Sequence, residues 1–219
     1  MKKLLSILCL LILVSCSPTP EIPSDEVPYD QLVERSGVQY QINSQIPFTG
    51  SVVDYDENGQ VEVKGNFKDG KEDGLIETYY ENGQIQEKLN FKDGVLDGPS
   101  EGYYENGQLM YKNNSKDGKK EGPSEGYHES GQLKYKTNFK DGKQDGLWES
   151  YYENGQLEFK TNFKEGKEVS VTRFSYYENG QLRLKKNWKD GIKDGLWEYF
   201  DEEGNLTKTE EYKDGVLQE

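Results

Sequence analysis

Residues 147–167 read LWESYYENGQLEFKTNFKEGK, and most of the chain consists of copies of this stretch. Its Asn154-Gly155 pair indicates a β-hairpin, because Asn and Gly tolerate the positive φ angles that a two-residue I′ turn requires. We therefore predict two antiparallel strands joined at these two residues. The register that follows pairs Tyr152 with Leu157, Tyr151 with Glu158, Ser150 with Phe159, and Glu149 with Lys160.

This register predicts two chemically different faces, because side chains alternate across a sheet. The apolar face holds Trp148, Ser150, Tyr152, Leu157, Phe159 and Phe163. The charged face holds Glu149, Tyr151, Glu158, Lys160 and Asn162. A slip of one residue would place both sets on the wrong side, so the register is strongly specified.

The stretch recurs at a nearly constant step. Successive units start at Tyr55, Tyr79, Tyr103, Tyr127, Tyr151, Tyr176 and Phe200, with a step of 24 residues that becomes 25 only between Tyr151 and Tyr176. A fixed period in this range is typical of a repeat array. We predict an all-β fold, an elongated single-layer antiparallel meander of tandem 24-residue hairpins over residues 55–219, with an N-terminal half-repeat cap at 37–54.

Two units depart from the pattern. Residues 167–175 contain Val169-Ser170 where other units have Asp-Gly or Glu-Gly, together with the extra residue, so we expect a bulge or kink there. The unit that starts at Tyr103 carries Asn113 and Ser115 at positions that are apolar elsewhere, and we expect it to be the weakest of the array.

The N-terminus has the features of a leader. Lys2 and Lys3 precede an apolar run that is too short to span a bilayer comfortably, which predicts a signal peptide over residues 1–15. The sequence Leu-Val-Ser-Cys that ends at Cys16 resembles the lipobox of bacterial lipoproteins, which implies that Cys16 becomes the lipidated N-terminus. The alternative is a secretory signal with an incidental Cys.

The residue after the lipobox Cys also indicates the membrane in which the protein would be anchored. In Gram-negative lipoproteins an Asp after the Cys resembles an inner-membrane retention signal, so Ser17 favours the outer membrane. Residues 16–36 would then hold the lipidated Cys and an extended tether, because prolines lie there among acidic and small residues.

Composition narrows the classes of partner and chemistry. Hydrophobic residues make up 32% and mean hydropathy is −1.00, yet the chain has 16 Tyr, 8 Phe and 3 Trp, too aromatic for a disordered protein. The net charge of −14 becomes −16 when Lys2 and Lys3 leave with the leader, which argues against nucleic acid as a partner. Both cysteines lie within residues 1–16, so disulfides, thiol nucleophiles and zinc clusters are excluded elsewhere.

The charged face carries three ladders of equivalent residues. The predicted register places Glu77 opposite Lys88, Glu101 opposite Lys112, Glu125 opposite Lys136, and Glu149 opposite Lys160. An Asn ladder follows two residues after each Lys. We interpret these ladders as cross-strand pairs that fix register, at about 0.2–1 kcal/mol each.

The same face carries a row of aromatic residues that is our candidate binding surface. This Tyr row consists of Tyr79, Tyr103, Tyr127, Tyr151, Tyr176 and Phe200. Equivalent strands are about 9–10 Å apart, so exposed rings could grip an extended polymer, a glycan or the edge of a protein partner. The alternative is that the rings only stack within the sheet.

No catalytic, metal or cofactor site is predicted. His128, the only histidine, replaces the second Tyr of its unit and has no nucleophile motif beside it. The acidic turns, such as residues 140–146, alternate carboxylates with Lys and lack the clustering of a calcium loop. The carboxylates repeat along the array, whereas an active site normally breaks symmetry, so we expect no enzyme.

The units resemble a known family. The pattern Tyr-Tyr-x-Asn-Gly, then an aromatic residue with Lys-Asp-Gly, then Gly-Leu-Trp, is similar to the MORN repeat in the bacterial variant of YwqK-family antitoxins, over about residues 46–219. The wall-binding repeats of Gram-positive toxins and autolysins also carry Tyr-Tyr and Asn-Gly, but they are shorter and open with Gly-Trp. The resemblance implies lipid contact, protein scaffolding or dimer assembly.

We therefore expect a lipid-anchored cell-envelope protein that acts as a non-catalytic binding or scaffold module for protein partners. Two alternatives stay open. One is a YwqK-family antitoxin, meaning a toxin-neutralising or immunity-like protein. The other is a glycan- or cell-wall-binding module that uses the Tyr row.

Overall fold

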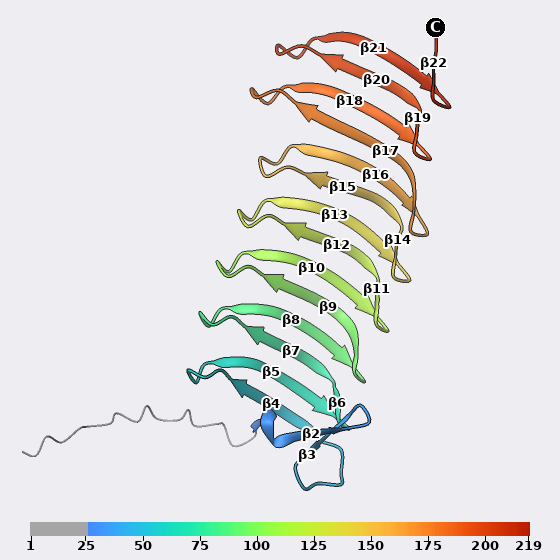
Figure 1. Cartoon of the computed structure of the whole chain (residues 1–219). Helices are drawn as coiled ribbons and strands as arrows, with labels where there is room; N and C mark the ends of the chain where they lie inside the picture. Colours follow the sequence, from blue (N-terminus) through green and yellow to red (C-terminus); the bar gives the residue numbers. More distant parts are fainter. Residues whose placement is uncertain (1–25) are drawn as a thin grey trace, which may run out of the picture.

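The computed structural model describes residues 26–219, and all of their strands except β2 and β3 belong to one long β-sheet (Figure 1). Seven consecutive antiparallel hairpins, numbered as repeats 1 to 7, build the array: β4 Gly50–Tyr55 with β5 Val61–Lys68, β7 Gly74–Tyr79 with β8 Ile85–Lys92, β9 Val95–Tyr103 with β10 Leu109–Lys116, β12 Gly122–Tyr127 with β13 Leu133–Lys140, β15 Gly146–Tyr151 with β16 Leu157–Lys164, β17 Lys167–Tyr176 with β18 Leu182–Lys189, and β20 Gly195–Phe200 with β21 Leu206–Lys213. Short strands at the second turns are β6 Lys71–Glu72, β11 Lys119–Lys120, β14 Lys143–Gln144, β19 Ile192–Lys193 and β22 Val216–Leu217.

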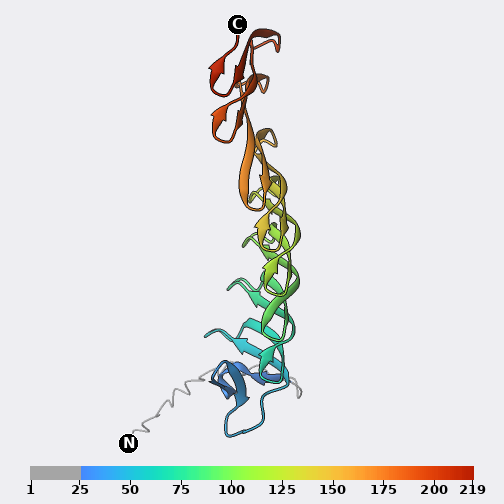
Figure 2. The ribbon, with the colours of Figure 1, turned by 90° about the vertical axis from the view of Figure 1, so that its right-hand side faces the viewer.

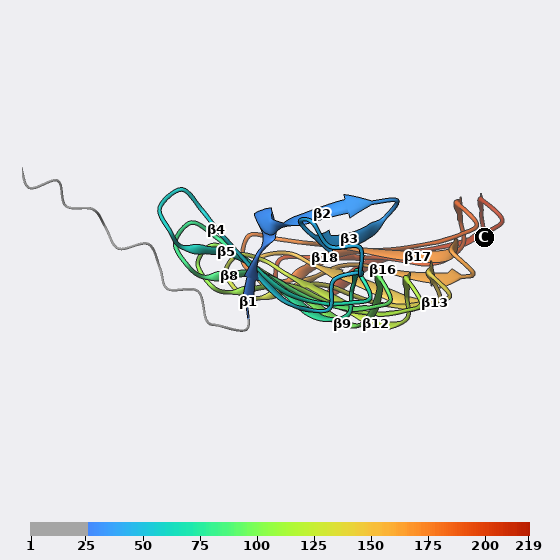
Figure 3. The ribbon, with the colours of Figure 1, turned by 90° about the horizontal axis from the view of Figure 1, so that it is seen from below.

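The predicted single-layer, all-β repeat array is confirmed. Turned by 90°, the sheet is a narrow twisted column with no second layer over most of its length (Figure 2). Viewed along its length, the strands bend into a shallow arch, and the β2–β3 hairpin lies on the inner side (Figure 3). Leu32 of this hairpin packs against Val52 and Phe67, so the apolar face is the inner side of the arch. No helix of the described residues is long and apolar enough to cross a membrane.

The register of repeat 5 matches the prediction away from the turn. Glu149 pairs with Lys160 and Ser150 with Phe159. Nearer the turn the prediction is wrong, because Tyr151 pairs with Leu157 and not with Glu158.

The difference arises in the turn. The N–H of Gly155 donates to the carbonyl of Tyr152 at 2.9 Å, and the N–H of Tyr152 donates to the carbonyl of Gln156 at 2.9 Å. Gly155 has a φ of +81°, whereas Asn154 is not among the residues with positive φ. The loop is therefore three residues long, a type that ends in a left-handed Gly. The extra loop residue and a bulge near Leu157 offset each other, which restores the predicted register beyond them.

The two-residue turns occur instead at the Asp-Gly positions. Asp141 and Gly142 have φ angles of +51° and +79°, and Lys140 pairs with Lys143 across them. Positive φ at both central residues defines the I′ turn.

Successive repeats are tied together at both edges. At the second turns, a carboxylate accepts a backbone N–H from the turn of the next repeat, as Asp97 does from Asp117 at 3.1 Å and Glu121 from Asp141 at 2.8 Å. At the other edge, the hydroxyl of Tyr80 donates to the carbonyl of Tyr103 at 2.6 Å. These contacts explain the acidic turns as structural elements.

The predicted irregularity at residues 167–175 is confirmed. The register shifts between Asn162 and Phe163, where β16 meets β17. In the regular repeats such a Lys lies opposite the residue two positions before the next Tyr of the row, which for Lys160 would be Phe174. Lys160 instead lies opposite Thr172. Repeat 6 is therefore displaced by two residues along the strands, and its turn interrupts the regular progression of turns in Figure 1.

The N-terminal end corrects part of the predicted tether over residues 16–36. The structure shows β1 Glu26–Pro28, the 3-10 turn η1 Tyr29–Gln31, β2 Leu32–Arg35 and β3 Val38–Gln41. β1 runs parallel to β4, and Val27 and Leu32 pack against Phe48, Val52 and Phe67, so residues 26–36 cover the first repeat. The prediction overlooked these apolar residues among the prolines. The signal peptide, Cys16 and the rest of the tether lie outside the described residues.

The predicted half-repeat cap at 37–54 contains two separate elements. β3 pairs with β2 in a two-stranded sheet, whereas β4 belongs to repeat 1. The N–H of Gly70 donates to the carbonyl of Phe48 at 2.7 Å, which joins this end to the second turn of repeat 1.

Candidate functional site

The charged face carries a nearly continuous line of alternating Glu and Lys. The predicted cross-strand register is confirmed for Glu77 with Lys88, Glu101 with Lys112, Glu125 with Lys136, and Glu149 with Lys160. Except for Lys160, which faces Thr172, these lysines also face the Glu of the next repeat. Several ion pairs form in that direction: Lys112 with Glu125 at 3.0 Å, Lys136 with Glu149 at 2.7 Å, and Lys185 with Glu198 at 2.6 Å. The line therefore joins repeats as well as strands.

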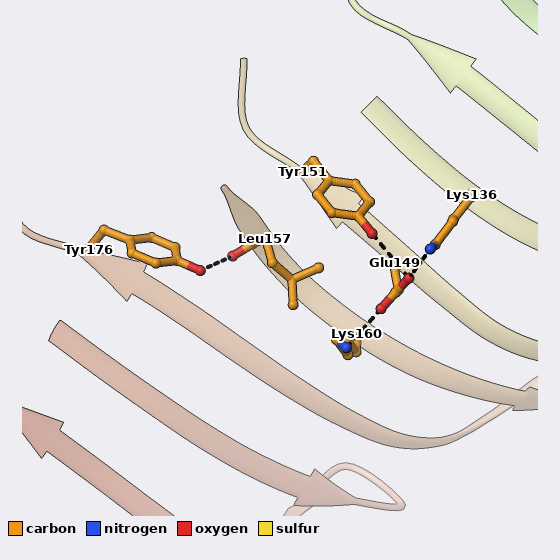
Figure 4. Close-up of polar contacts among 6 residues, drawn as sticks. All are labelled: Lys136, Glu149, Tyr151, Leu157, Lys160 and Tyr176. Carbon is orange, nitrogen blue, oxygen red and sulfur yellow. Dashed lines mark hydrogen bonds and ion pairs between the residues drawn. The ribbon is translucent and has the colours of Figure 1, made fainter. Parts of the chain in front are cut away.

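Glu149 is the most enclosed member of this line. Its side chain lies between Lys136 at 2.7 Å and Lys160 at 2.8 Å, and it also accepts a hydrogen bond from the Tyr151 hydroxyl at 3.0 Å (Figure 4). Burial alone would raise the pKa of Glu149, but hydrogen bonds from the two lysines and from Tyr151 outweigh it and hold the pKa at about 2.

The Tyr row lies on this face as predicted, and all six residues are half-buried. Four hydroxyls donate to the Glu two residues earlier: Tyr79 to Glu77, Tyr103 to Glu101, Tyr127 to Glu125, and Tyr151 to Glu149. The bond to Glu101, burial and the charge of Glu101 raise the pKa of Tyr103 to about 12, so its hydroxyl stays a donor. These hydroxyls already have partners, which leaves ring edges and faces for any ligand.

The row changes where repeat 6 is displaced. The Tyr176 hydroxyl donates to the carbonyl of Leu157 at 2.9 Å, across the repeat boundary (Figure 4). Its ring meets Tyr152 edge-on, with ring centroids 6.4 Å apart. Tyr176 is therefore held differently from the residues before it.

The Asn ladder has a local structural role. Asn66 donates to the carbonyl of Leu75 at 3.3 Å, and Asn90 donates to that of Pro99 at 2.8 Å. These bonds span the irregular segment between one repeat and the next.

His128 behaves as a substituted tyrosine. Its Nε2 lies 3.0 Å from the carbonyl oxygen of Tyr151, the contact that Tyr104 makes with Tyr127 at 2.8 Å one repeat earlier. In residues 26–219, no group of three or more His, Cys, Asp or Glu side chains is arranged to hold a metal ion.

The apolar face changes its chemistry from repeat to repeat, which the consensus unit does not reveal. The directly opposed pairs at its centre are Val52 with Gly65, Ile76 with Leu89, Ser100 with Asn113, Ser124 with Thr137, Trp148 with Thr161, Arg173 with Lys186, and Trp197 with Glu210. The face is aliphatic at the N-terminal end, polar and neutral in the middle, and aromatic and charged at the C-terminal end. Reading these positions in register would have found this signal in the sequence.

In the middle repeats, tyrosine rings pack over glycines of the paired strand. The ring of Tyr111 covers Gly102, and the ring of Tyr135 covers Gly126. Ser115 is buried in the unit predicted to be the weakest, and so is Ser100, which faces Asn113 of that unit. The Ser100 hydroxyl has no partner among the described residues. The relative weakness of this unit stays a prediction.

The comparisons with known proteins agree with the repeat architecture. Seven segments match the family described as MORN repeat variant, at residues 48–69, 72–93, 96–117, 120–141, 144–165, 171–190 and 193–214. No curated protein matches the chain. The crystal structure of accessory secretory protein 1, 2 and 3 in Streptococcus pneumoniae is similar at 18% identity, covering 46% of this chain and 17% of that chain, with a TM-score of 0.19. This likeness is too distant to bear on function.

Proposed function

Because the chain belongs to the MORN repeat variant family, whose repeats generally serve as binding or scaffold modules, we propose that it is a non-catalytic module that binds protein partners at the cell envelope. Cys16 would carry the lipid anchor and hold the array at a membrane, on the outer membrane in a Gram-negative cell. One observation carries the proposal: the sheet is a single layer, so most of both faces is open to a partner.

The arrangement of side chains supports binding over catalysis. The charged face repeats the same carboxylates, lysines and tyrosines at a constant spacing, and these groups are paired with one another. A long surface of this kind suits an extended partner, which gains affinity from several equivalent contacts.

The binding proposal is tested with the processed chain as bait. The bait should recover a protein from solubilised envelopes, and the same protein in purified form should bind it directly. Recovery of polysaccharide without any directly binding protein would contradict the proposal and favour a glycan-binding module. If that protein is a toxin and the chain neutralises it, the binding function is that of an antitoxin.

The anchor is tested separately by Cys16→Ala. We expect the wild-type protein to sediment with membranes and to carry acyl chains on its N-terminal Cys, because several acyl chains give stable anchoring. The Cys16→Ala variant should lose the acyl mass and the membrane fraction. Cys9→Ala is the matched control and should retain both. A wild-type protein with an unmodified N-terminus would refute the anchor.

A further inference from the structure

Repeat 6 breaks the symmetry of the array in several independent ways. It contains the extra residue, its register with repeat 5 is displaced, and Phe174 stands where five of the other six repeats place the ladder Glu. The family match is also shorter there, covering residues 171–190. A binding site distinct from the repeated surface is best sought where the repeat is broken.

The centre of its apolar face carries two cations directly opposite each other. Arg173 of β17 pairs in register with Lys186 of β18. Opposed like charges on a sheet destabilise it, and none of the other six repeats has such a pair at this position. This pair of like charges therefore does not stabilise the fold. A bound anion would neutralise the charges of both side chains.

These cations line a groove with an apolar wall. The groove includes Val171, Leu184 and Trp188 beside Arg173 and Lys186, with Glu168 as its one carboxylate. Leu184 and Trp188 are half-buried and leave apolar surface accessible, whereas Val171 is buried at 7% exposure; Arg173 is exposed. The groove thus offers both apolar contact and accessible positive charge.

The cations rest on aromatic rings without a carboxylate partner. The Arg173 guanidinium lies 5.9 Å from the centroid of Trp188, and the Lys186 ammonium lies 4.7 Å from that of Trp197. Lys193 lies 4.4 Å from the centroid of the same Trp197 ring. The ion pairs found in residues 26–219 involve none of these three cations. Their N–H groups remain available to an anionic ligand, while the rings hold them in place.

We propose that this groove binds an acidic peptide segment of a protein partner, with a carboxylate on Arg173 and Lys186 and an apolar side chain against Leu184. The proposal rests on the proposed protein-binding function and names its site. Charge complementarity carries it: a cationic groove stands out in a chain of net charge −14. Arg is suited to carboxylates because its planar fork can bind them bidentately.

Two other anionic partners fit less well. A sugar polymer would stack on open aromatic faces, but cations of the chain itself lie over Trp188 and Trp197. An anionic membrane surface would be repelled by the acidic chain and could not follow the concave apolar face. The peptide is therefore the occupant that uses both the charge and the apolar wall.

The test uses the whole processed chain and a short fluorescent peptide that alternates Glu and Leu. The double variant Arg173→Ser/Lys186→Thr installs the pair that repeat 4 has at Ser124 and Thr137. We expect it to weaken binding at least about tenfold, because two charge-assisted hydrogen bonds are lost. The matched control Lys119→Thr/Lys143→Thr removes the same charge from exposed positions in other repeats and should bind like the wild type. A peptide with Gln in place of Glu should bind at least about tenfold more weakly.

A measurement of thermal unfolding distinguishes loss of the binding site from loss of folding. The double variant should unfold at the same or a higher temperature, because it removes a repulsive pair. Equal binding of the Glu and Gln peptides, or unchanged binding by the double variant, overturns the proposal. A third outcome also overturns it: the wild type does not bind the peptide but binds acidic polysaccharide or anionic vesicles, and the double variant loses that binding. If the protein recovered from envelopes binds the double variant normally, the groove proposal fails while the proposed function stands.

Discussion

Glu149→Gln is expected to lower the free energy of unfolding of repeats 4 and 5 by about 2 kcal/mol at neutral pH, because it leaves two lysines facing a neutral amide. The Glu149 side chain is 8% exposed, and its carboxylate lies between Lys136 at 2.7 Å and Lys160 at 2.8 Å. Amide hydrogen exchange on β13, β15 and β16 measures the change where it occurs. A measurement on individual strands suits a repeat array, because its stability is a sum over the units and their interfaces with neighbours.

The same residue predicts a pH dependence. The pKa of Glu149 is about 2 in the folded chain, below the ordinary value of about 4.3 in an unfolded one. Its stabilising contribution is therefore complete above about pH 5 and is lost as the pH falls from there toward 2. The Glu149→Gln variant should lack this part of the acid sensitivity.

The matched control is Glu77→Gln. Glu77 has one ion pair, to Lys88 at 3.7 Å, and is more exposed, so its loss should cost less than about 1 kcal/mol. Equal effects of the two substitutions would show that the enclosure of Glu149 has no special energetic value.

Gly126→Val is expected to destabilise repeat 4 by about 2–3 kcal/mol, because the new side chain has no room. A Cβ at Gly126 would lie 2.2 Å from Cε1 of Tyr135, whose ring covers the glycine. The same measurement, amide exchange on β12 and β13, should show the loss.

The cause can be isolated with a double-mutant cycle. In a Tyr135→Ala background the ring is absent, and Gly126→Val should then cost less than about 1 kcal/mol. If the cost is the same in both backgrounds, backbone conformation and not contact with the ring is responsible.

The sequence predicted the repeat architecture because its signals are local and are repeated many times. Alternation of Glu149, Ser150 and Tyr151 fixes the faces, and seven similar copies reinforce one register. The turn type was less accessible. Asn-Gly and Asp-Gly both tolerate positive φ, and only tertiary structure shows that Asp141-Gly142 forms the two-residue turn while Gly155 alone is left-handed in the other.

The N-terminal cap and the groove in repeat 6 were missed for different reasons. Val27 and Leu32 lie among prolines and acidic residues, and their partner Phe67 is distant in sequence. Arg173 and Lys186 face each other in the ordinary hairpin register of repeat 6, so their opposition was readable from the sequence, but the consensus unit hides how this position varies between repeats. Non-local pairing decided the cap, whereas local variation decided the groove.

In a one-layer array each repeat rests only on its neighbours, so removal of one whole unit, residues 104–127, should shorten the protein without unfolding it. Small-angle X-ray scattering of this variant should show a folded protein whose maximum dimension is shorter by about 9–10 Å, two strand spacings. An unfolded variant, or a folded one of unchanged length, would show that the repeats do not stack in a single layer.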